Sequence, residues 1–277
     1  MPDSPFCNAP TLSVQRAPRR QRRHLVFLRC GSRPATVIAP ALLATPRNWD
    51  LALSCYQPPP EGNPLNQAAD FLLGGGLAKF HAAKLFLTAT GLLGQYATVL
   101  FLDDDLELHF DPADFFAYQH AEGLDLAQPS LSHDSFANFR TTLHNPSFHH
   151  RQTNFVETMA PSMMGRFLPQ VVGQFDRTIS GWGLDLLWAR ALGSKGKAAV
   201  VDRFTMRHTR PAEPAGPFYQ YLASLGVNAL DDLRGVMGEL GLERYEIGLV
   251  NAVFIRDLIE RPPATAIDPP AADPVSA

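Results

Sequence analysis

Short apolar runs alternate with longer segments of helical periodicity along most of the chain. We expect strands at His24–Cys30, Leu51–Tyr56, Thr98–Leu102, Asp125–Gln128, Phe155–Ala160 and Ala198–Asp202, since each run is brief and bounded by turn residues or charges. We expect helices at Leu77–Tyr96, Asp111–Glu122, Met163–Phe175, Gly183–Leu192 and Asn228–Leu240. This alternation predicts an α/β fold with a mostly parallel central sheet flanked by helices, in which ligands bind beyond the carboxyl ends of the strands.

The two ends of the chain differ from the middle in composition. Residues 1–23 are rich in Pro, Ser and Arg, and residues 259–277 are rich in Pro and Ala. Both compositions resist packing, so we predict a disordered basic leader and a disordered tail. The middle, residues 24–258, is predicted to form one domain that ends in a helical extension over residues 216–258.

The formal charge of -3 conceals an uneven distribution. Seven of the 24 basic residues lie in the first 33 positions with one acid, and the remainder carries 17 basic and 26 acidic residues. Such an acidic body argues against nucleic acid as a partner, because binding a phosphate backbone needs a broad basic surface. The arginines of the leader could give weak peripheral contact with an anionic membrane, although a solvated leader is the simpler interpretation. We find no apolar run long enough to span a bilayer.

Three consecutive carboxylates follow an apolar, β-branched run. Asp103, Asp104 and Asp105 would repel one another at the end of a buried strand unless a positive charge lies among them. In extended backbone, residues two apart point to the same side, so Asp103 and Asp105 are expected to converge on one divalent cation while Asp104 faces elsewhere. The simpler interpretation is a solvated strand end.

The segment Ser180–Asp185 places two glycines around a tryptophan at the start of a helical pattern. Glycines permit a backbone with positive φ and close approach to a ligand, and the indole of Trp182 can stack on a sugar ring. We therefore assign Trp182 and Gly183 to sugar or acceptor binding and Asp185 to catalysis. A helix entry with a core tryptophan is the alternative.

Polar residues also interrupt the run from Arg151 to Pro161. Buried polar side chains need partners, so Asn154 and Glu157 are expected to face a polar cleft, Asn154 to bind the acceptor and Glu157 to rival Asp185 as the base. Four cations are candidates for binding a phosphorylated donor, together with Asp103 and Asp104; they are Lys79, Lys84, Arg207 and Arg210.

Three motifs in this order, FLDDDLEL, TNFVETMAP and GWGLD, resemble the family catalogued as domain of unknown function 707 (DUF707), which occurs in plants and bacteria. The match runs from about Leu77 to about His208. That family is itself similar to nucleotide-sugar glycosyltransferases of the GT-A fold. The resemblance implies that Asp103 and Asp105 are the ends of the DXD motif that holds a divalent metal, commonly manganese and alternatively magnesium. It also implies that His208 completes the metal site and that Asp185 binds the acceptor.

The resemblance implies a metal-dependent glycosyltransferase of the hexosyltransferase type, which moves a sugar from a nucleotide-sugar donor to a hydroxyl of a glycan or another acceptor. The chemistry fits, because a cation can stabilise the departing diphosphate while a carboxylate takes the hydroxyl proton. Two alternatives remain: a member of the fold that binds nucleotide or glycan without catalysis, and a phosphatase of the haloacid dehalogenase type. The three cysteines form no disulfide framework, which together with the lack of an anchor favours a bacterial cytoplasmic protein.

Overall fold

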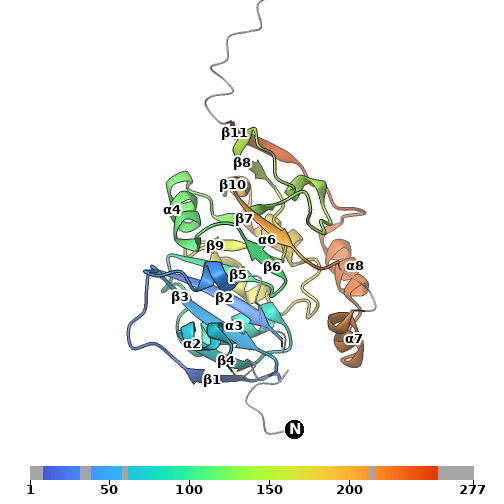
Figure 1. Ribbon diagram of the computed structural model, residues 1–277. Coiled ribbons are helices and arrows are strands. Elements are labelled where there is room, and N and C mark those ends of the chain that lie inside the picture. The colour runs from blue at the N-terminus through green and yellow to red at the C-terminus, as the bar shows by residue number, and fades with distance from the viewer. Residues whose placement is uncertain (1–8, 32–38, 58–61, 212–215, 255–277) are drawn as a thin grey trace, which may run out of the picture.

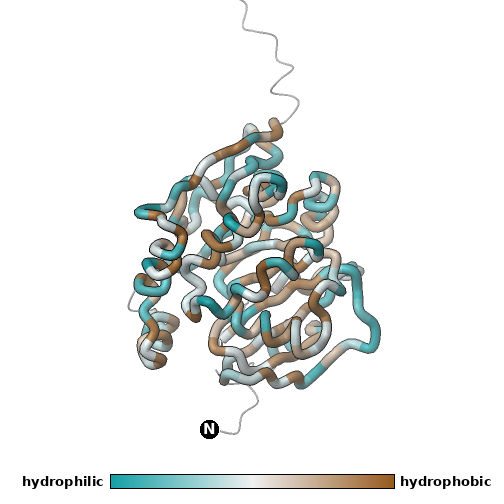
Figure 2. The backbone as a smooth tube through the Cα atoms, turned by 180° about the vertical axis from the view of Figure 1, so that it is seen from behind, coloured by the Kyte–Doolittle hydropathy of each residue, from teal (hydrophilic) through white to brown (hydrophobic). Residues whose placement is uncertain are grey.

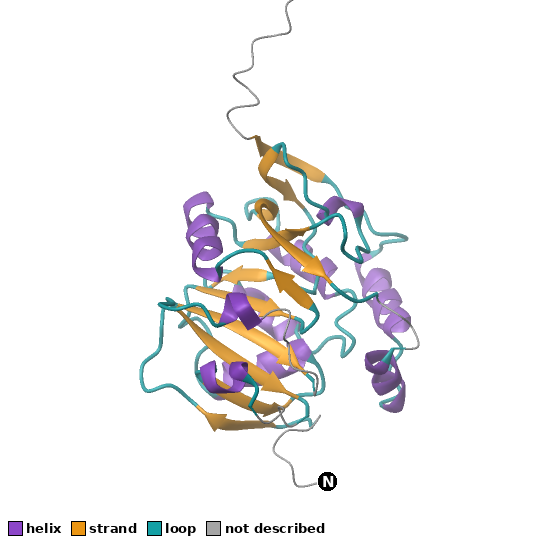
Figure 3. Cartoon of the chain, viewed as in Figure 1, coloured by secondary structure: helices purple, strands orange, loops and turns teal. Residues whose placement is uncertain are grey.

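A computed structural model of the chain describes residues 9–31, 39–57, 62–211 and 216–254. The described residues form a large mixed sheet with helices on both faces (Figures 1 and 3). Its strands are β1 (Leu12–Arg16), β2 (His24–Cys30), β3 (Trp49–Cys55), β4 (Phe71–Gly75), β5 (Thr98–Leu102), β6 (Leu106–Leu108), β7 (Leu126–Leu131), β8 (Phe148–Thr153), β9 (Ser162–Met164), β10 (Ala198–His208) and β11 (Leu249–Phe254).

The strand order is β1-β4-β3-β2-β5-β9-β7-β10-β8-β11, and β6 pairs with β10 outside this path. The neighbours β4, β3, β2 and β5 run parallel, as do β7 and β10. Antiparallel strands join these parts and extend the sheet, with β9 between β5 and β7, β1 at one edge and β8 with β11 at the other. The prediction of an α/β fold with a mostly parallel central sheet is confirmed.

Alternation along the central strands sends side chains into two cores. Val26 and Leu28 of β2 face one core, which is closed by α1 (Ala39–Leu42), α2 (Pro64–Ala68) and α4 (Pro112–Glu122). Leu25 and Phe27 face the other, which is closed by α3 (Lys79–Ala89), α5 (Leu168–Val171), α6 (Leu184–Leu192) and α8 (Ala229–Leu240). This is the two-sided burial that apolar strands of a parallel sheet require. Two 3-10 turns, η1 (Arg140–Thr142) and η2 (Val172–Gln174), and helix α7 (Pro217–Ser224) complete the elements.

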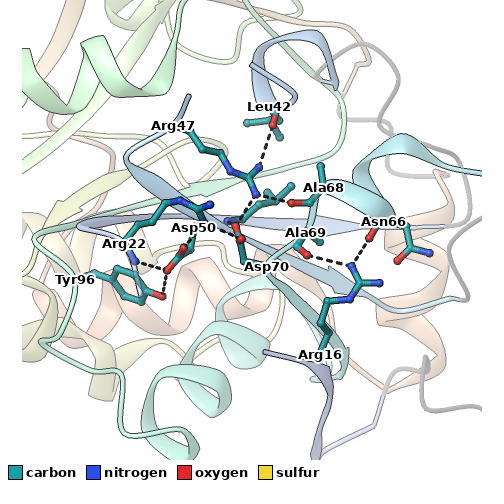
Figure 4. Close-up of polar contacts among 11 residues, drawn as sticks. Arg16, Arg22, Leu42, Arg47, Asp50, Asn66, Ala68, Ala69, Asp70 and Tyr96 are labelled. Carbon is teal, nitrogen blue, oxygen red and sulfur yellow. Dashed lines mark hydrogen bonds and ion pairs between the residues drawn. The ribbon is translucent and has the colours of Figure 1, made fainter. Parts of the chain in front are cut away.

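Part of the leader is ordered, which corrects the prediction of disorder over residues 1–23. Strand β1 pairs antiparallel with β4, and the hydrophilic loop that follows it (Figure 2) brings Arg22 to the amino ends of the strands. There Arg22, Arg47, Asp50, Asp70 and Tyr96 form a hydrogen-bonded group, partly buried at Arg22 and fully buried at Asp50, which we call the amino-edge cluster (Figure 4). Composition alone did not predict this order, because Arg22 of the leader has carboxylate partners, Asp50 and Asp70, that are distant in sequence. Residues 1–8 and the predicted tail lie outside the described residues.

Three further sequence predictions are wrong in detail. Phe155–Ala160 is a buried loop, and the strand of this region is β8, just before it. The predicted helix at Met163–Phe175 is divided into β9, α5 and η2, because Gly165 packs against the backbone of Tyr96 and Pro169 starts a new helix. The predicted helical extension contains α7 and α8 but ends in strand β11. Within the described ranges, no helix is long and apolar enough to cross a membrane.

Candidate functional site

The acidic triplet lies where β5 ends, at the carboxyl edge of the parallel strands. Residues 103–105 form a turn between β5 and β6, so the alternation expected of extended backbone does not apply. Asp103 points to Lys79 of α3, Asp104 to the backbone of Gly31 after β2, and Asp105 to His208 of β10. The three carboxylates therefore reach three different elements.

Asp103 is neutralised by a buried lysine. Lys79 Nζ lies 2.8 Å from Asp103 Oδ1 and donates to the carbonyl oxygens of Thr158 at 2.6 Å and Met159 at 3.1 Å. These contacts use all three donors of the ammonium group, so Lys79 has none left for a donor phosphate, which corrects that prediction. Burial raises the pKa of Asp103 to about 6, against the opposing charge of Lys79.

Asp105 and His208 face each other across paired strands. His208 is the register partner of Leu106, which places its Nε2 3.4 Å from Asp105 Oδ2. Its Nδ1 lies 2.7 Å from the carbonyl oxygen of Phe136, and a carbonyl can only accept, so Nδ1 carries a proton in this contact. In the neutral ring, Nε2 is then a lone-pair donor directed at Asp105, which is the tautomer that ligates metals.

The other oxygen of Asp105, Oδ1, is buried and has no hydrogen-bond partner among the described residues. Burial opposes ionisation of Asp105, but the hydrogen bond and charge of His208 outweigh it and hold the pKa of Asp105 below its ordinary value. Burial likewise opposes protonation of His208, while Asp105 raises its pKa above the ordinary value. The metal-free pair therefore favours a protonated His208 that donates from Nε2 to Asp105. If a cation displaces that proton, Nε2 and the buried, partnerless Oδ1 of Asp105 are a nitrogen and an oxygen that can ligate it.

The predicted convergence of Asp103, Asp105 and His208 is not observed. In the part of the chain that the structure describes, no three His, Cys, Asp or Glu side chains are grouped to hold a metal ion. The reason is the turn at residues 103–105, which directs Asp103 to Lys79. Of the predicted set, Asp105 and His208 face each other, whereas Asp103 is paired with Lys79.

The predicted donor-binding cations are not brought together. Arg210 Nη2 lies 4.0 Å from Asp104 Oδ1, at the acidic turn, and Asp104 Oδ2 accepts from the Gly31 amide at 3.0 Å. Burial raises the pKa of Asp104. In contrast, Lys84 pairs with Asp176 at 2.7 Å on the outer side of α3. Arg207 alternates with His208 along β10 and pairs with Asp134 at 2.9 Å and Glu107 at 3.4 Å, so it points away from Asp105.

Asp185 lies in the first turn of α6, where two glycines shape the backbone. Gly181 and Gly183 have φ values of 82° and 88°, as the sequence suggested, and a side chain at Gly183 would collide with Val236 of α8. Asp185 is 6% exposed; its Oδ1 accepts from the Leu186 amide at 2.9 Å. Burial raises the pKa of Asp185 to about 7, which is suitable for a group that takes a proton near neutral pH.

Glu157 lies in the buried loop after β8 and is 3% exposed. Both of its carboxyl oxygens are buried, and neither has a hydrogen-bond partner of good geometry among the described residues. Burial raises its pKa to about 7, Thr142 nearby opposes this, and the charge of Asp185 adds to it. Asp185 is also buried, but unlike Glu157 its carboxylate is held by hydrogen bonds from the Leu186 amide and the Tyr245 hydroxyl.

Asn154 is exposed and lines a pocket together with Phe155, Leu186 and Glu246. Its Nδ2 donates to the Glu246 carbonyl at 2.7 Å, and its Oδ1 accepts from the Gly248 amide at 2.8 Å, so its side chain holds the C-terminal segment. Trp182 is half-buried, and its ring meets Tyr219 of α7 edge-on with centroids 6.2 Å apart. Tyr219 is close enough to Asp103 for that charge to raise its pKa, although burial is the larger cause.

Sequence reasoning missed two contributors, Tyr219 and Tyr245. Both belong to the C-terminal region, and neither lies in a motif or a periodic pattern that distinguishes it. Only their spatial neighbours, Trp182 for Tyr219 and Asp185 for Tyr245, indicate a role.

Comparisons with known proteins bear on the fold. No protein-family model matches the chain, and no curated protein matches it in sequence. Among solved structures, GalNAc-T7 with UDP, GalNAc and Mn2+ is similar at TM-score 0.54 and 10% identity, covering 79% of this chain and 48% of GalNAc-T7. The chain thus spans about half the length of that structure.

Two further structures are more remote. S. aureus TarS 1-349 has TM-score 0.44 and 10% identity, covering 78% of this chain and 70% of TarS. A197 from STIV has TM-score 0.41 and 12% identity, covering 67% and 85%. The likeness to GalNAc-T7 shows that the chain has a glycosyltransferase-like α/β fold of the GT-A type.

Proposed function

We propose that this protein is a metal-dependent glycosyltransferase that transfers a sugar from a nucleotide-sugar donor to a hydroxyl-bearing acceptor. We also propose that it belongs to the DUF707 family, on the three motifs named above. The fold supports the class of reaction, and GalNAc-T7, which shares the fold, was solved with a nucleotide, a sugar and manganese.

The observation that carries the proposal is the arrangement of Asp105 and His208. The Phe136 carbonyl fixes Nδ1 of His208 as a donor, Nε2 faces Asp105, and Asp105 Oδ1 is buried without a partner. Asp105 and His208 would hold a divalent cation, manganese or magnesium. Such a cation supplies positive charge beside the diphosphate of the donor.

The remaining roles follow from charge and position. Arg210, at the rim of the acidic turn, is placed to contact a phosphate oxygen. In a transfer with inversion, the acceptor oxygen forms a bond to the anomeric carbon while the bond from that carbon to the diphosphate breaks. Asp185 accepts the hydroxyl proton, as its raised pKa permits. Trp182 and Tyr219 would offer aromatic surface to a sugar ring.

The test uses the full chain with a panel of nucleotide sugars, with MnCl2 or EDTA. We expect release of nucleoside diphosphate that requires metal. We also expect nucleoside diphosphate to raise Tm only when metal is present; a nucleotide concentration of about 100 times Kd would stabilise the folded protein by about 2.7 kcal/mol. Asp105→Ala should abolish the metal-dependent part of the shift. Asp176→Ala removes an acid that pairs with Lys84 away from the acidic turn and should leave the shift intact.

Three results would contradict the proposal. No effect of any nucleotide or metal on Tm would remove the basis for a transferase. Release of inorganic phosphate from phosphoesters without binding of a nucleoside diphosphate would favour a phosphatase instead. Metal-dependent nucleotide binding without turnover of any sugar would indicate a binding protein of the same fold.

A further inference from the structure

The C-terminal segment between α8 and β11 brings a tyrosine to Asp185 from 60 residues away in the sequence. The hydroxyl of Tyr245 lies 3.4 Å from Asp185 Oδ1 and 3.5 Å from Oδ2. Because a carboxylate can only accept, the phenol is the donor in this contact. Both distances are long for hydrogen bonds, so one hydroxyl is shared between two oxygens.

The aromatic ring of Tyr245 is held on two sides. It packs against Phe139, with centroids 5.2 Å apart, and meets Phe155 edge-on at 5.7 Å and 89°. Phe139 and Phe155 also pack on each other at 4.6 Å. Perpendicular aromatic contacts of this kind restrict the ring and so direct the hydroxyl.

The backbone that carries Tyr245 is also fixed. Asn154 accepts a hydrogen bond from the Gly248 amide and donates one to the Glu246 carbonyl. Strand β11, which follows, pairs antiparallel with β8. Tyr245 is therefore held both by the packing of its ring and by the hydrogen bonds of the backbone that follows it. Its position does not depend on the contact with Asp185 alone.

The carboxylate retains capacity for a second donor. Oδ1 of Asp185 accepts from the Leu186 amide and Tyr245, whereas Oδ2 accepts only from Tyr245 among the described residues. A carboxylate offers about four lone-pair sites, so Oδ2 can receive the proton of an acceptor while Tyr245 keeps its contact.

We propose that Tyr245 is a positioning residue for Asp185, whose hydroxyl orients the carboxylate and stabilises its charged form so that Oδ2 can take the acceptor proton. This inference rests on the proposed function for the reaction that Asp185 serves, but the contact itself can be tested without turnover. Two titratable groups face Asp185: Tyr245 from the C-terminal segment and Glu157 from the loop after β8. The charge of Asp185 raises the pKa of Glu157, and the hydrogen bond from Tyr245 lowers the pKa of Asp185 against the larger effect of burial.

The first measurement is a titration of the full chain labelled with 13C at the carboxyl carbons of aspartate, which leaves Glu157 silent. The signal of Asp185 is assigned by its loss in Asp185→Asn. We expect its midpoint near pH 7 in the native protein and about one pH unit higher in Tyr245→Phe, because the charged form loses a hydrogen bond. Asn154→Ala, which keeps the hydroxyl but releases the segment, should give a smaller shift in the same direction.

The second measurement is the pH profile of nucleoside diphosphate release. In Tyr245→Phe we expect about a tenfold loss of kcat at pH 6, near-native kcat at pH 9 and an unchanged KM for the donor. Tyr118→Phe is the matched control. It also removes one phenolic hydroxyl, but that hydroxyl bonds to His150 Nδ1 at 2.8 Å and makes no contact with Asp185 among the hydrogen bonds of the described residues. It should leave the profile unchanged.

The outcomes separate the two proposals. A midpoint for Asp185 that does not move in Tyr245→Phe overturns the positioning role, as does an equal loss of kcat at every pH. If the native protein transfers no sugar from any donor, the glycosyltransferase proposal fails, while the titration still decides whether Tyr245 stabilises the charged form of Asp185.

Discussion

The two edges of the parallel strands carry buried carboxylates in opposite states. At the amino edge, both oxygens of Asp50 and of Asp70 accept hydrogen bonds, from Arg22, Arg47, Tyr96 and the Leu51 amide (Figure 4). At the carboxyl edge, Asp105 Oδ1 and both oxygens of Glu157 have no partner among the described residues. A buried polar group without a partner costs free energy, so the first arrangement stabilises the fold, whereas the second does not and, under the proposed function, would serve a ligand or a reaction.

The largest effect should come from breaking the satisfied edge. Asp50→Asn places an amide group against the donors of Arg22 and Tyr96, and loss of one partner from a buried ionic group costs about 4 kcal/mol. The check is urea unfolding followed by circular dichroism. Glu157→Gln is the matched change at the other edge; it breaks no hydrogen bond of good geometry and should cost far less. Equal losses in both variants would remove the distinction between the edges.

A smaller effect of opposite sign is expected at Asp185. Its pKa is raised to about 7 in the fold from an ordinary value of 3.8, so between these pH values the folded protein holds a proton that the unfolded chain has released. Stability therefore falls as pH rises through this window. Asp185→Asn removes the penalty and should stabilise the protein by on the order of 3 kcal/mol at pH 8, and by little at pH 4.

Urea unfolding of native protein and Asp185→Asn at both pH values measures this difference. Destabilisation of the variant by the same amount at pH 4 and pH 8 would show that Asp185 has a structural role that does not depend on its charge. The variant should in any case lose turnover while it retains binding of the donor.

The smallest of the three effects belongs to the amino edge. His24, the first residue of β2, stacks on Phe116 with centroids 4.7 Å apart and is 3% exposed. Burial lowers its pKa from 6.5 to about 4, so the unfolded chain binds the proton more readily and stability is lost as pH falls between these values. The loss at pH 4 should be about 2 kcal/mol.

His24→Phe keeps the stacking and removes the titration. Unfolding free energies at pH 7 and pH 4.5 should converge in this variant relative to the native protein. If the pH dependence of the variant matched that of the native protein, the loss at low pH would have another source. Acid thus acts in opposite directions at the two edges, through His24 at one and Asp185 at the other.

The strands could be predicted where apolar runs are buried on both faces. His24–Cys30 and Thr98–Leu102 have the predicted bounds, because their residues alternate between two helix-covered cores. The run Phe155–Ala160 is also largely buried but forms no strand. The carbonyls of Thr158 and Met159 bind Lys79 instead, and periodicity carries no information about such a partner.

The candidate site could be predicted in composition but less well in geometry. The sequence indicated that carboxylates follow a buried strand and that glycines bend the backbone before Asp185, and the position of the triplet after β5 and the positive φ values agree, although the triplet forms a turn and not the expected extended backbone. It did not reveal that Asp103 would be neutralised by Lys79, nor that Tyr245 would reach Asp185. Both contacts depend on tertiary packing between segments that share no motif, so a single amino-acid sequence does not indicate them.

Strand β1 has a consequence for the resistance of the protein to self-association. It pairs antiparallel with β4, with Leu12 opposite Gly75. This pairing covers the backbone donors and acceptors of β4 that would otherwise face solvent at the edge of the sheet. An open edge of this kind is a template for pairing with another chain and hence for aggregation. The segment that composition predicts to be disordered therefore covers β4 with a short edge strand of five residues, and removing residues 1–23 would expose β4 to intermolecular strand pairing.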